Sequence, residues 1–340
     1  MLELSPCLVK WNPVAPVLRR LTAWLPAAQA TVFDYYGNWI FDRWAANLLT
    51  YLKNSVDAVI GYENSCRYTF RTAKALGIKT VLDAASVHHT LQDSVSHFSE
   101  STPFHRRVIA VKNEEIKLAD HILTLSTVAR QSYLDAGVHA ERLHLLPLGV
   151  DLLTFRPGDH TTRGLFFTFI FSGKVTIHKG IDFLIQAFKK VLKRYPNVKL
   201  RIIGFGGDGY PLVRTASLPQ IEWLGFVTQT ELAKHYQAAD CLVLPSRHDS
   251  YGMVVTEALA SGLPVIISDR VGAKDIIEEG KNGWVVPLGD IESLADRMLW
   301  MVEHRTELEP MRVLARRTAE KYSWDDYQKR LVDVLQTILN

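Results

Sequence analysis

The sequence predicts an α/β protein with two doubly wound parallel sheets, and three observations support this prediction. Short apolar runs of strand length alternate with segments whose apolar residues recur at helical spacing, as in parallel sheets covered by helices on both faces. The chain has 340 residues, which is enough for two hydrophobic cores. Turn-forming residues interrupt the alternation at 150–157, where we place the boundary between two Rossmann-like domains, 1–155 and 156–322.

The second half shows the alternation most clearly. Apolar residues at helical spacing fill 181–195, and Pro196 ends that helix. Thr228 and Glu231 form a capping box that predicts the start of another helix. The remaining predicted helices are one around Glu257 that Gly262 ends, a short one near Asp275, and 291–304. The predicted strands are 166–172, 199–204, 220–226, 241–246, 263–269 and 284–287.

The first half repeats the theme less regularly. The predicted strands are 56–61, 79–83, 121–126 and 143–146, and the predicted helices lie near 40–53, 66–76, 104–119 and 127–136. Because parallel strands carry ligands at their carboxyl ends, two such domains would bind ligands in the cleft between them.

Composition excludes several classes of protein. A net charge of +3, spread over both halves, lacks the basic face of a nucleic-acid binder. The three cysteines are widely spaced and fit no metal site, which favours a reduced, cytoplasmic setting. No apolar run reaches the ~18 residues of a membrane span. The stretch 17–25 could lie on a membrane surface, giving peripheral contact at its inner face, although a packing helix is the favoured interpretation.

Two carboxylates on either side of a glycine form the most informative motif. Asp249 follows a predicted buried strand, and Glu257 lies about a turn into the next helix. Gly252 between them lets the backbone approach a ligand, with amide groups pointing outward at a helix N-terminus. Such an N-terminus attracts phosphate, and carboxylates accept from pairs of sugar hydroxyls. A nucleotide-sugar satisfies both demands.

A second loop adds positive charge to this predicted site. After the strand 166–172 come Gly173 and Lys174, and Lys179 precedes the glycine that opens the next helix. Two lysines at a glycine turn could neutralise a diphosphate, although surface lysine pairs also arise by chance. Together with the acidic motif in the same domain, phosphate binding becomes the favoured interpretation.

These motifs together resemble the donor-binding domain of retaining glycosyltransferases of family four (glycosyl transferases group one), which have the GT-B fold. The matching segments of the second half are 172–180, 239–246, 249–257, 258–265 and 280–290. In the first half, the segments 118–126, 137–138, 147–151 and 155–157 match as well. The combination is specific, whereas each piece alone is weak. The resemblance extends from about Asp57 to the end, where 323–340 resembles the family's last helix, which returns toward the first domain.

The resemblance implies roles for individual residues. Glu257 matches the carboxylate that binds the ribose hydroxyls, and Asp249 stands where the family usually has a glutamate that contacts the transferred sugar. Lys174 and Lys179 match residues that face the diphosphate. His88 matches a histidine near the reacting sugar, with His89 as the alternative. The backbone amides of Gly252, Met253, Val254 and Val255 would serve sugar and phosphate oxygens.

The sequence departs from the family pattern at two places. Asp249 is one methylene shorter than glutamate, which could alter sugar preference or rate. Family members also begin with a strand and a glycine-rich loop, which we do not find before Asp57. The first domain is therefore expected to be abbreviated at its N-terminus or built differently there, which bears on the acceptor site.

The resulting hypothesis is metal-independent transfer of a sugar from a UDP- or GDP-sugar to a glycan or lipid-linked saccharide, with retention of configuration. No Asp-x-Asp metal motif occurs, so we expect neither a metal nor another cofactor. One alternative is a catalytically reduced nucleotide-sugar binder or a partner-dependent subunit. A less favoured alternative is an NAD-dependent oxidoreductase, suggested by the glycine pattern at 204–209.

Overall fold

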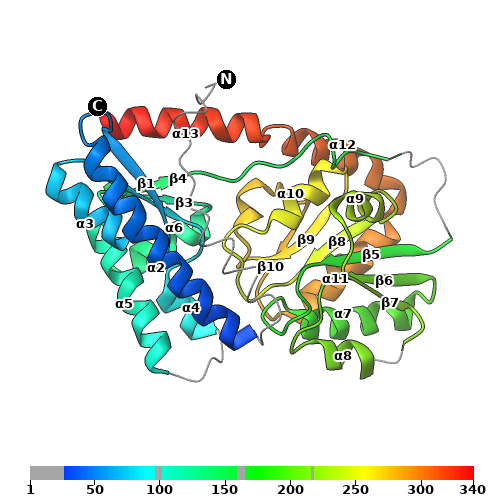
Figure 1. Ribbon diagram of the computed structural model, residues 1–340. Helices are drawn as coiled ribbons and strands as arrows, with labels where there is room; N and C mark the ends of the chain where they lie inside the picture. Colours follow the sequence, from blue (N-terminus) through cyan, green and yellow to red (C-terminus); the bar gives the residue numbers. More distant parts are fainter. Residues whose placement is uncertain (1–26, 96–101, 159–164, 216–217) are drawn as a thin grey trace.

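Two parallel sheets lie side by side in the protein (Figure 1). The computed structural model describes residues 27–95, 102–158, 165–215 and 218–340; Cys7 and the stretch 17–25 fall outside these residues. The first sheet has the strand order β1-β2-β3-β4, and the second has the order β10-β9-β8-β5-β6-β7. All of their strand pairs are parallel. The predicted α/β class with two parallel sheets is therefore confirmed.

The first sheet and its helices come from the N-terminal part of the chain. Its strands are β1 (Ala58–Tyr62), β2 (Lys79–Ala84), β3 (His121–Thr124) and β4 (Leu143–Leu145). Its helices are α2 (Ala27–Leu52), α3 (Arg67–Leu76), α4 (His89–Val95), α5 (Pro103–Leu118) and α6 (Thr127–Asp135), followed by the 3₁₀ turn η2 (Ala140–Arg142).

Helix α2 begins well before the predicted start near residue 40, and α4 was not predicted. Tyr35 and its neighbours up to Asn38 are weak helix formers, so local propensity indicated a later start. In the structure the Tyr35 ring packs edge-on against Phe104 of α5, with ring centroids 5.4 Å apart. Further along α2, the buried Asp42 carboxylate accepts from the amides of Tyr68 and Thr69 and so caps α3. Tertiary contacts of this kind extend the helix.

Alternate residues of the first sheet face two different layers. Val81 of β2 contacts the side packed by the C-terminal helix α13 (Trp324–Leu339), in a cluster that includes Leu123 and Ile338. The next residue, Leu82, joins Phe70 of α3 in the cluster on the other side. Helix α13 crosses from the second sheet to the first, and the chain ends there (Figure 1).

The second sheet is built from the six later strands. They are β5 (Phe167–Ser172), β6 (Val198–Ile203), β7 (Ile221–Gly225), β8 (Cys241–Leu244), β9 (Val265–Ser268) and β10 (Gly283–Val286). The helices are α7 (Ile181–Arg194), α8 (Tyr210–Thr215), α9 (Gln229–Gln237), α10 (Met253–Ala260), α11 (Ile291–Glu303) and α12 (Leu308–Ala319), with 3₁₀ turns η3 (Gly272–Ile276) and η4 (Arg305–Glu307). The capping box predicted at Thr228 and Glu231 is present, whereas α12 was not predicted.

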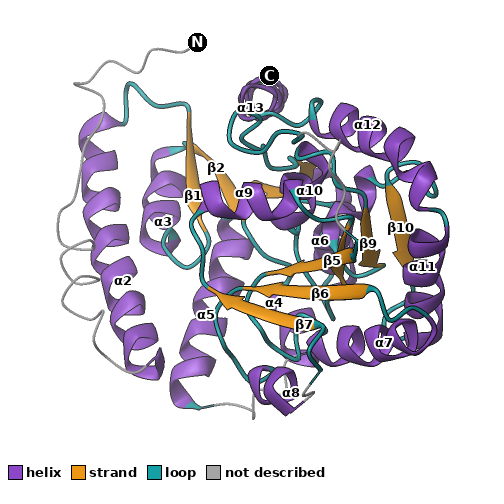
Figure 2. Ribbon diagram, turned by 90° about the vertical axis from the view of Figure 1, so that its right-hand side faces the viewer, coloured by secondary structure: helices purple, strands orange, loops and turns teal. Residues whose placement is uncertain are grey.

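Helices cover both faces of the second sheet, as its near-continuous apolar strands require. Helices α9, α10 and α12 lie on one face, and α7, α8 and α11 lie on the other (Figure 2). Every residue of β5, β8 and β9 is buried. This rigid core holds the loops at the carboxyl ends of β5 and β8 in place. No helix among the described residues is long and apolar enough to span a membrane.

Candidate functional site

The loops that follow β5 and β8 lie next to each other because these two strands pair in the sheet. Lys179 comes from the first loop and Asp249 from the second. The Lys179 Nζ lies 2.5 Å from the Asp249 Oδ2, although the two residues are 70 positions apart. Both side chains keep some exposure, 26% for Lys179 and 17% for Asp249. The structure thus brings two of the predicted site residues into an accessible ion pair.

Arg247 fastens these two loops together. Its guanidinium donates to both carboxylate oxygens of Asp182 at 2.8 and 2.9 Å and lies over the Phe183 ring. The Arg247 amide donates to the His178 carbonyl at 2.8 Å. His178 and Asp182 lie on either side of Lys179 in the sequence, and Arg247 lies two residues before Asp249, so these contacts fix the position of the ion pair.

Gly180 makes a close backbone approach at the same point. Its φ of 73° is in the left-handed region, and a Cβ at this position would lie 1.9 Å from the Pro245 carbonyl oxygen. Only glycine therefore lets the loop carrying Lys179 pass so close to the end of β8.

The variant Gly180→Ala should lower the free energy of unfolding by about 2–4 kcal/mol, because it adds a steric clash to the cost of left-handed backbone. Gly77→Ala is the matched control, since Gly77 also has a φ of 73° but a Cβ there meets nothing within 4 Å. Denaturant titration of both variants measures the difference. Equal destabilisation of the two variants would show that the short distance between Gly180 and the Pro245 carbonyl does not exclude a side chain at position 180.

The N-terminus of α10 faces the same region. Gly252 has a φ of 86° and caps the helix, and the amides at the start of α10 have no acceptor within the helix. Val255 differs from the other predicted binding residues, because its amide donates to the Gly252 carbonyl at 2.8 Å. The helix end therefore offers the amides of Gly252, Met253 and Val254 to an anion, and not that of Val255.

Glu257 lies in the second turn of α10, and only 8% of it is exposed. Burial raises the pKa of its carboxyl to about 7, and the neighbouring Tyr236 hydroxyl opposes this shift in part. The charge of Glu257 in turn helps burial to raise the pKa of Tyr236. A carboxyl with a pKa near 7 is only partly ionised at neutral pH. Hydroxyl groups that donate to it would stabilise its ionised form.

Lys174 is exposed and pairs with no carboxylate among the described residues. Its neighbour Gly173 has a φ of 140°, and Gly204 packs so closely that a Cβ there would lie 1.8 Å from the Gly173 carbonyl oxygen. Gly204 thus supports the loop after β5. Helix α8, which follows the glycines at 204–209, has only six residues, so the segment lacks the long helix that the dinucleotide fingerprint requires.

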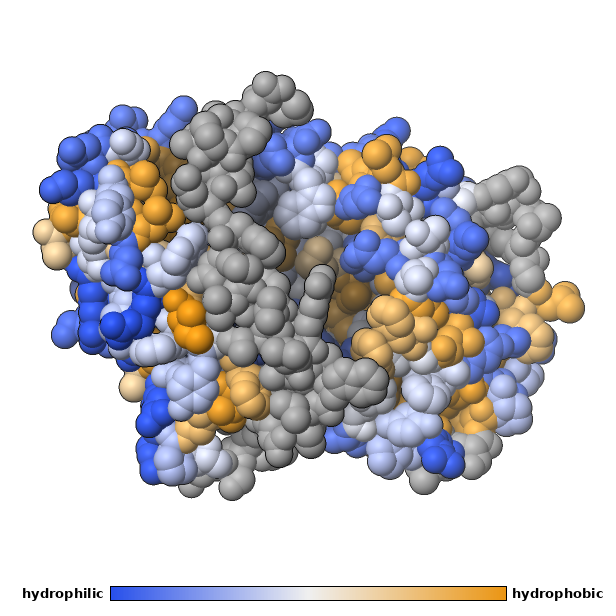
Figure 3. Space-filling view, viewed as in Figure 1, coloured by the Kyte–Doolittle hydropathy of each residue, from blue (hydrophilic) through white to orange (hydrophobic). Residues whose placement is uncertain are grey.

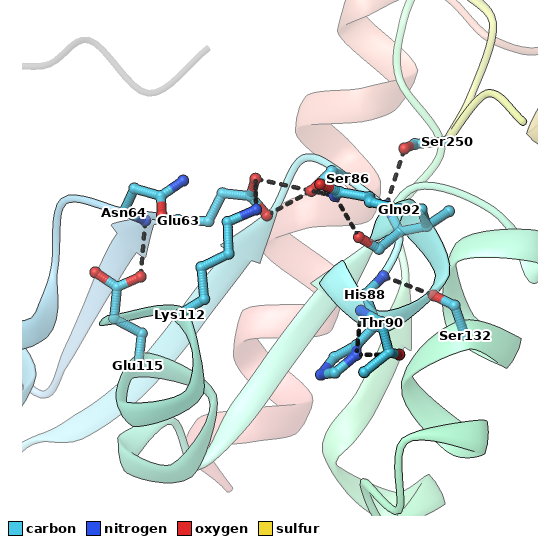
Figure 4. A network of polar contacts seen from close by, with 11 residues as sticks. Glu63, Asn64, Ser86, His88, Thr90, Gln92, Lys112, Glu115, Ser132 and Ser250 are labelled. Carbon is cyan, nitrogen blue, oxygen red and sulfur yellow. Dashed lines mark hydrogen bonds and ion pairs between the residues drawn. The ribbon is translucent and has the colours of Figure 1, made fainter. Parts of the chain in front are cut away.

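His88 is not brought into contact with Asp249. Its ring nitrogen Nδ1 pairs with the Thr90 hydroxyl at 2.8 Å (Figure 4). The ring also packs edge-on against Tyr133. Burial lowers the pKa of His88 to about 4, so it is neutral at pH 7. His89 is equally buried. These local partners fix the orientation of the His88 ring, and its role beside the reacting sugar stays a prediction.

A pocket of about 370 Å³ opens between the two sheets, and its lining includes several residues that were not predicted. Asp249 and Gly252 contribute from the second sheet, while Tyr62 and Asp83 contribute from the carboxyl ends of β1 and β2. On the face shown in Figure 3, hydrophilic and hydrophobic residues are mixed over both halves. The remaining lining residues are Ala85, Leu125, Leu148, Ser250, Tyr251 and Met253.

Ser250 joins the two halves at this pocket. Its carbonyl accepts from the Ser126 hydroxyl at 2.7 Å, and its own hydroxyl accepts from the Val87 amide at 2.9 Å. Tyr251 donates to the Leu148 carbonyl at 3.0 Å. The residues next to Asp249 therefore hold the carboxyl ends of both sheets against each other.

Comparisons with known proteins agree with this geometry. Residues 159–321 match the family described as glycosyl transferases group 1. A D-inositol 3-phosphate glycosyltransferase of Corynebacterium urealyticum is 28% identical over 67% of this chain and 64% of its own length, so the chain spans less than two thirds of that relative. Sucrose-phosphate synthase of Thermosynechococcus elongatus superposes with a TM-score of 0.72 at 18% identity, covering 93% of this chain and 80% of its own. Anabaena HepE in complex with UDP gives 0.70 at 17% identity, covering 86% and 82%.

Proposed function

Because residues 159–321 match the family described as glycosyl transferases group 1, we propose that this chain transfers a sugar from a nucleoside-diphosphate sugar to a saccharide acceptor. A UDP- or GDP-sugar is the donor, and a glycan or lipid-linked saccharide is the acceptor. The configuration at the transferred carbon is retained. The structure of HepE in complex with UDP supports the donor class by analogy.

The observation that carries this proposal is the position of Lys179 and Asp249 beside the N-terminus of α10. A bound diphosphate would share the Lys179 ammonium with Asp249 and accept from the amides at the start of the helix. Glu257, further along α10, would accept from the ribose hydroxyls. Cleavage leaves negative charge on the distal phosphate, which Lys179 and the helix amides stabilise more strongly in the transition state than in the ground state.

A thermal-shift screen followed by turnover tests the proposal. UDP-, GDP- and ADP-sugars are compared with NAD, and slow hydrolysis of the stabilising sugar nucleotide is then measured. Stabilisation with hydrolysis supports the enzyme. Stabilisation without any turnover would instead favour a nucleotide-sugar binder or a partner-dependent subunit. Stabilisation by NAD alone would contradict the proposal.

Turnover should not require a divalent ion, because the two lysines and the helix amides supply the positive potential that a diphosphate needs. We expect the rate of donor hydrolysis to change less than twofold when a chelator is added. Abolished activity that magnesium or manganese restores would contradict this expectation.

A further inference from the structure

Asp83 stands out in the pocket between the sheets because no cation of the described residues pairs with its carboxylate. It lies near the carboxyl end of β2, half-buried, and its carboxylate has neither a hydrogen-bond donor nor an ion-pair partner among the described residues. Burial raises the pKa of Asp83, and the charge of Glu63 adds to this effect. A half-buried charge without a partner costs stability, so its presence in a pocket is typical of a ligand-binding role.

The two lysines nearest to this region already pair with other carboxylates. Lys112 lies 3.7 Å from Glu63, which also accepts from the Ser86 hydroxyl (Figure 4). Lys179 pairs with Asp249 on the opposite side of the pocket. No lysine or arginine lines the pocket within the described part of the chain. Asp83 therefore gives this side of the pocket a net negative potential.

Two tyrosines belong to the elements around Asp83. Tyr62 is its partner in the β1–β2 register, and both residues line the pocket. Tyr327 of α13 packs in the cluster that contains Val81, two residues before Asp83, and burial together with the charge of Asp83 raises its pKa. A carboxylate that shares a pocket with a phenol ring suits a polyol, whose hydroxyls donate to the carboxylate while its C–H groups pack against the ring.

We propose that Asp83 accepts a hydrogen bond from a hydroxyl of the acceptor, and that this pocket selects an unphosphorylated polyol over its phosphate ester. This inference rests on the proposed function, since the pocket faces Asp249 and Gly252 of the donor side. A phosphate near Asp83 would meet a like charge and no free cation in the lining, so it is rejected by repulsion. The selection would differ from that indicated by the name of the D-inositol 3-phosphate glycosyltransferase among the relatives.

The test measures acceptor binding by saturation-transfer NMR, with the donor side filled by UDP. The probes are two matched pairs, inositol with inositol 3-phosphate and glucose with glucose 6-phosphate. The wild-type protein should bind at least one unphosphorylated probe, at least tenfold more tightly than its ester. Asp83→Ala should weaken that binding at least tenfold, and Asp83→Lys should reverse the preference. The control is Asp57→Asn, which changes an exposed aspartate just before β1 and should leave binding unchanged.

A second measurement separates binding from a structural role. Asp83→Asn removes an uncompensated charge, so it should leave the melting temperature equal or higher while it weakens probe binding. A lowered melting temperature with unchanged binding would overturn the inference. Tighter binding of the phosphate esters to the wild type, or no binding of either unphosphorylated probe, would overturn it as well. Loss of UDP affinity in the wild-type protein would instead count against the proposed function.

Discussion

Turnover of the sugar-nucleotide donor should fall by two to three orders of magnitude in Lys179→Ala. Removing one preorganised donor to developing negative charge typically raises the barrier by ~3–4 kcal/mol. Lys179 is well placed for this role, because the bidentate ion pair of Arg247 with Asp182 holds its loop and Asp249 orients its ammonium. Steady-state kinetics of donor hydrolysis measures the change in kcat.

Lys179→Ala also leaves the Asp249 carboxylate without its partner, so further variants are needed to separate this effect from the loss of catalysis. Lys179→Arg keeps the charge and should recover part of the turnover, and the double variant Lys179→Ala with Asp249→Asn removes the orphaned carboxylate. Lys174→Ala probes the exposed lysine of the same loop and should cost less, since Lys174 pairs with no carboxylate among the described residues. If kcat stayed near normal in Lys179→Ala, the assignment of Lys179 to the leaving group would be lost.

The meeting of Lys179 and Asp249 could be predicted from the sequence because it follows from backbone topology. Both residues were expected in loops at the carboxyl ends of buried parallel strands, and the pairing of β5 with β8 places such loops side by side. The strands themselves were found close to their predicted positions, since continuous apolar runs between turn residues leave few alternatives.

The side-chain contacts that complete the site were harder to predict. The contacts of the His88 ring with Thr90 and Tyr133 were not predicted, and the expected place of His88 near the reacting sugar stays a prediction. Asp83 was visible at the end of a predicted strand, and that position was the available signal. Whether Asp83 has an ion-pair partner depends on tertiary contacts, such as the pairing of Lys112 with Glu63. The local sequence around Asp83 does not predict such contacts.

Nucleotide affinity should fall about 10- to 100-fold in Glu257→Gln. A hydrogen bond to a charged acceptor is worth ~1.5–3 kcal/mol, and the neutral amide loses this charge assistance. The affinity of the wild type for UDP should also depend on pH. Burial raises the pKa of Glu257 to about 7, so about half of this carboxyl is ionised at pH 7. If the ionised form binds the ribose as proposed, affinity should weaken as pH falls below 7. Calorimetric titration between pH 5.5 and 8.5 measures both effects.

Stability should change with pH in the opposite sense. The folded pKa of Glu257 lies above its ordinary value of 4.5, so the folded protein binds the proton more tightly than the unfolded chain. The stabilisation from this proton is fully present below pH 4.5 and is lost as pH rises through 7. Glu257→Gln should therefore melt at a higher temperature than the wild type at pH 8, with the difference closing toward pH 5.

Glu115 provides the matched control, because burial also raises its pKa to about 7 but it lies beside the first sheet. Its carboxylate accepts from the amides of Asn64 and Cys66 at 2.7 and 2.9 Å. Glu115→Gln should thus alter the pH dependence of stability and leave UDP affinity unchanged. If both variants weakened UDP binding equally, the loss of affinity in Glu257→Gln would come from a change in folding and not from a lost contact with the ribose. A pH-independent affinity in the wild type would likewise remove Glu257 from the nucleotide site.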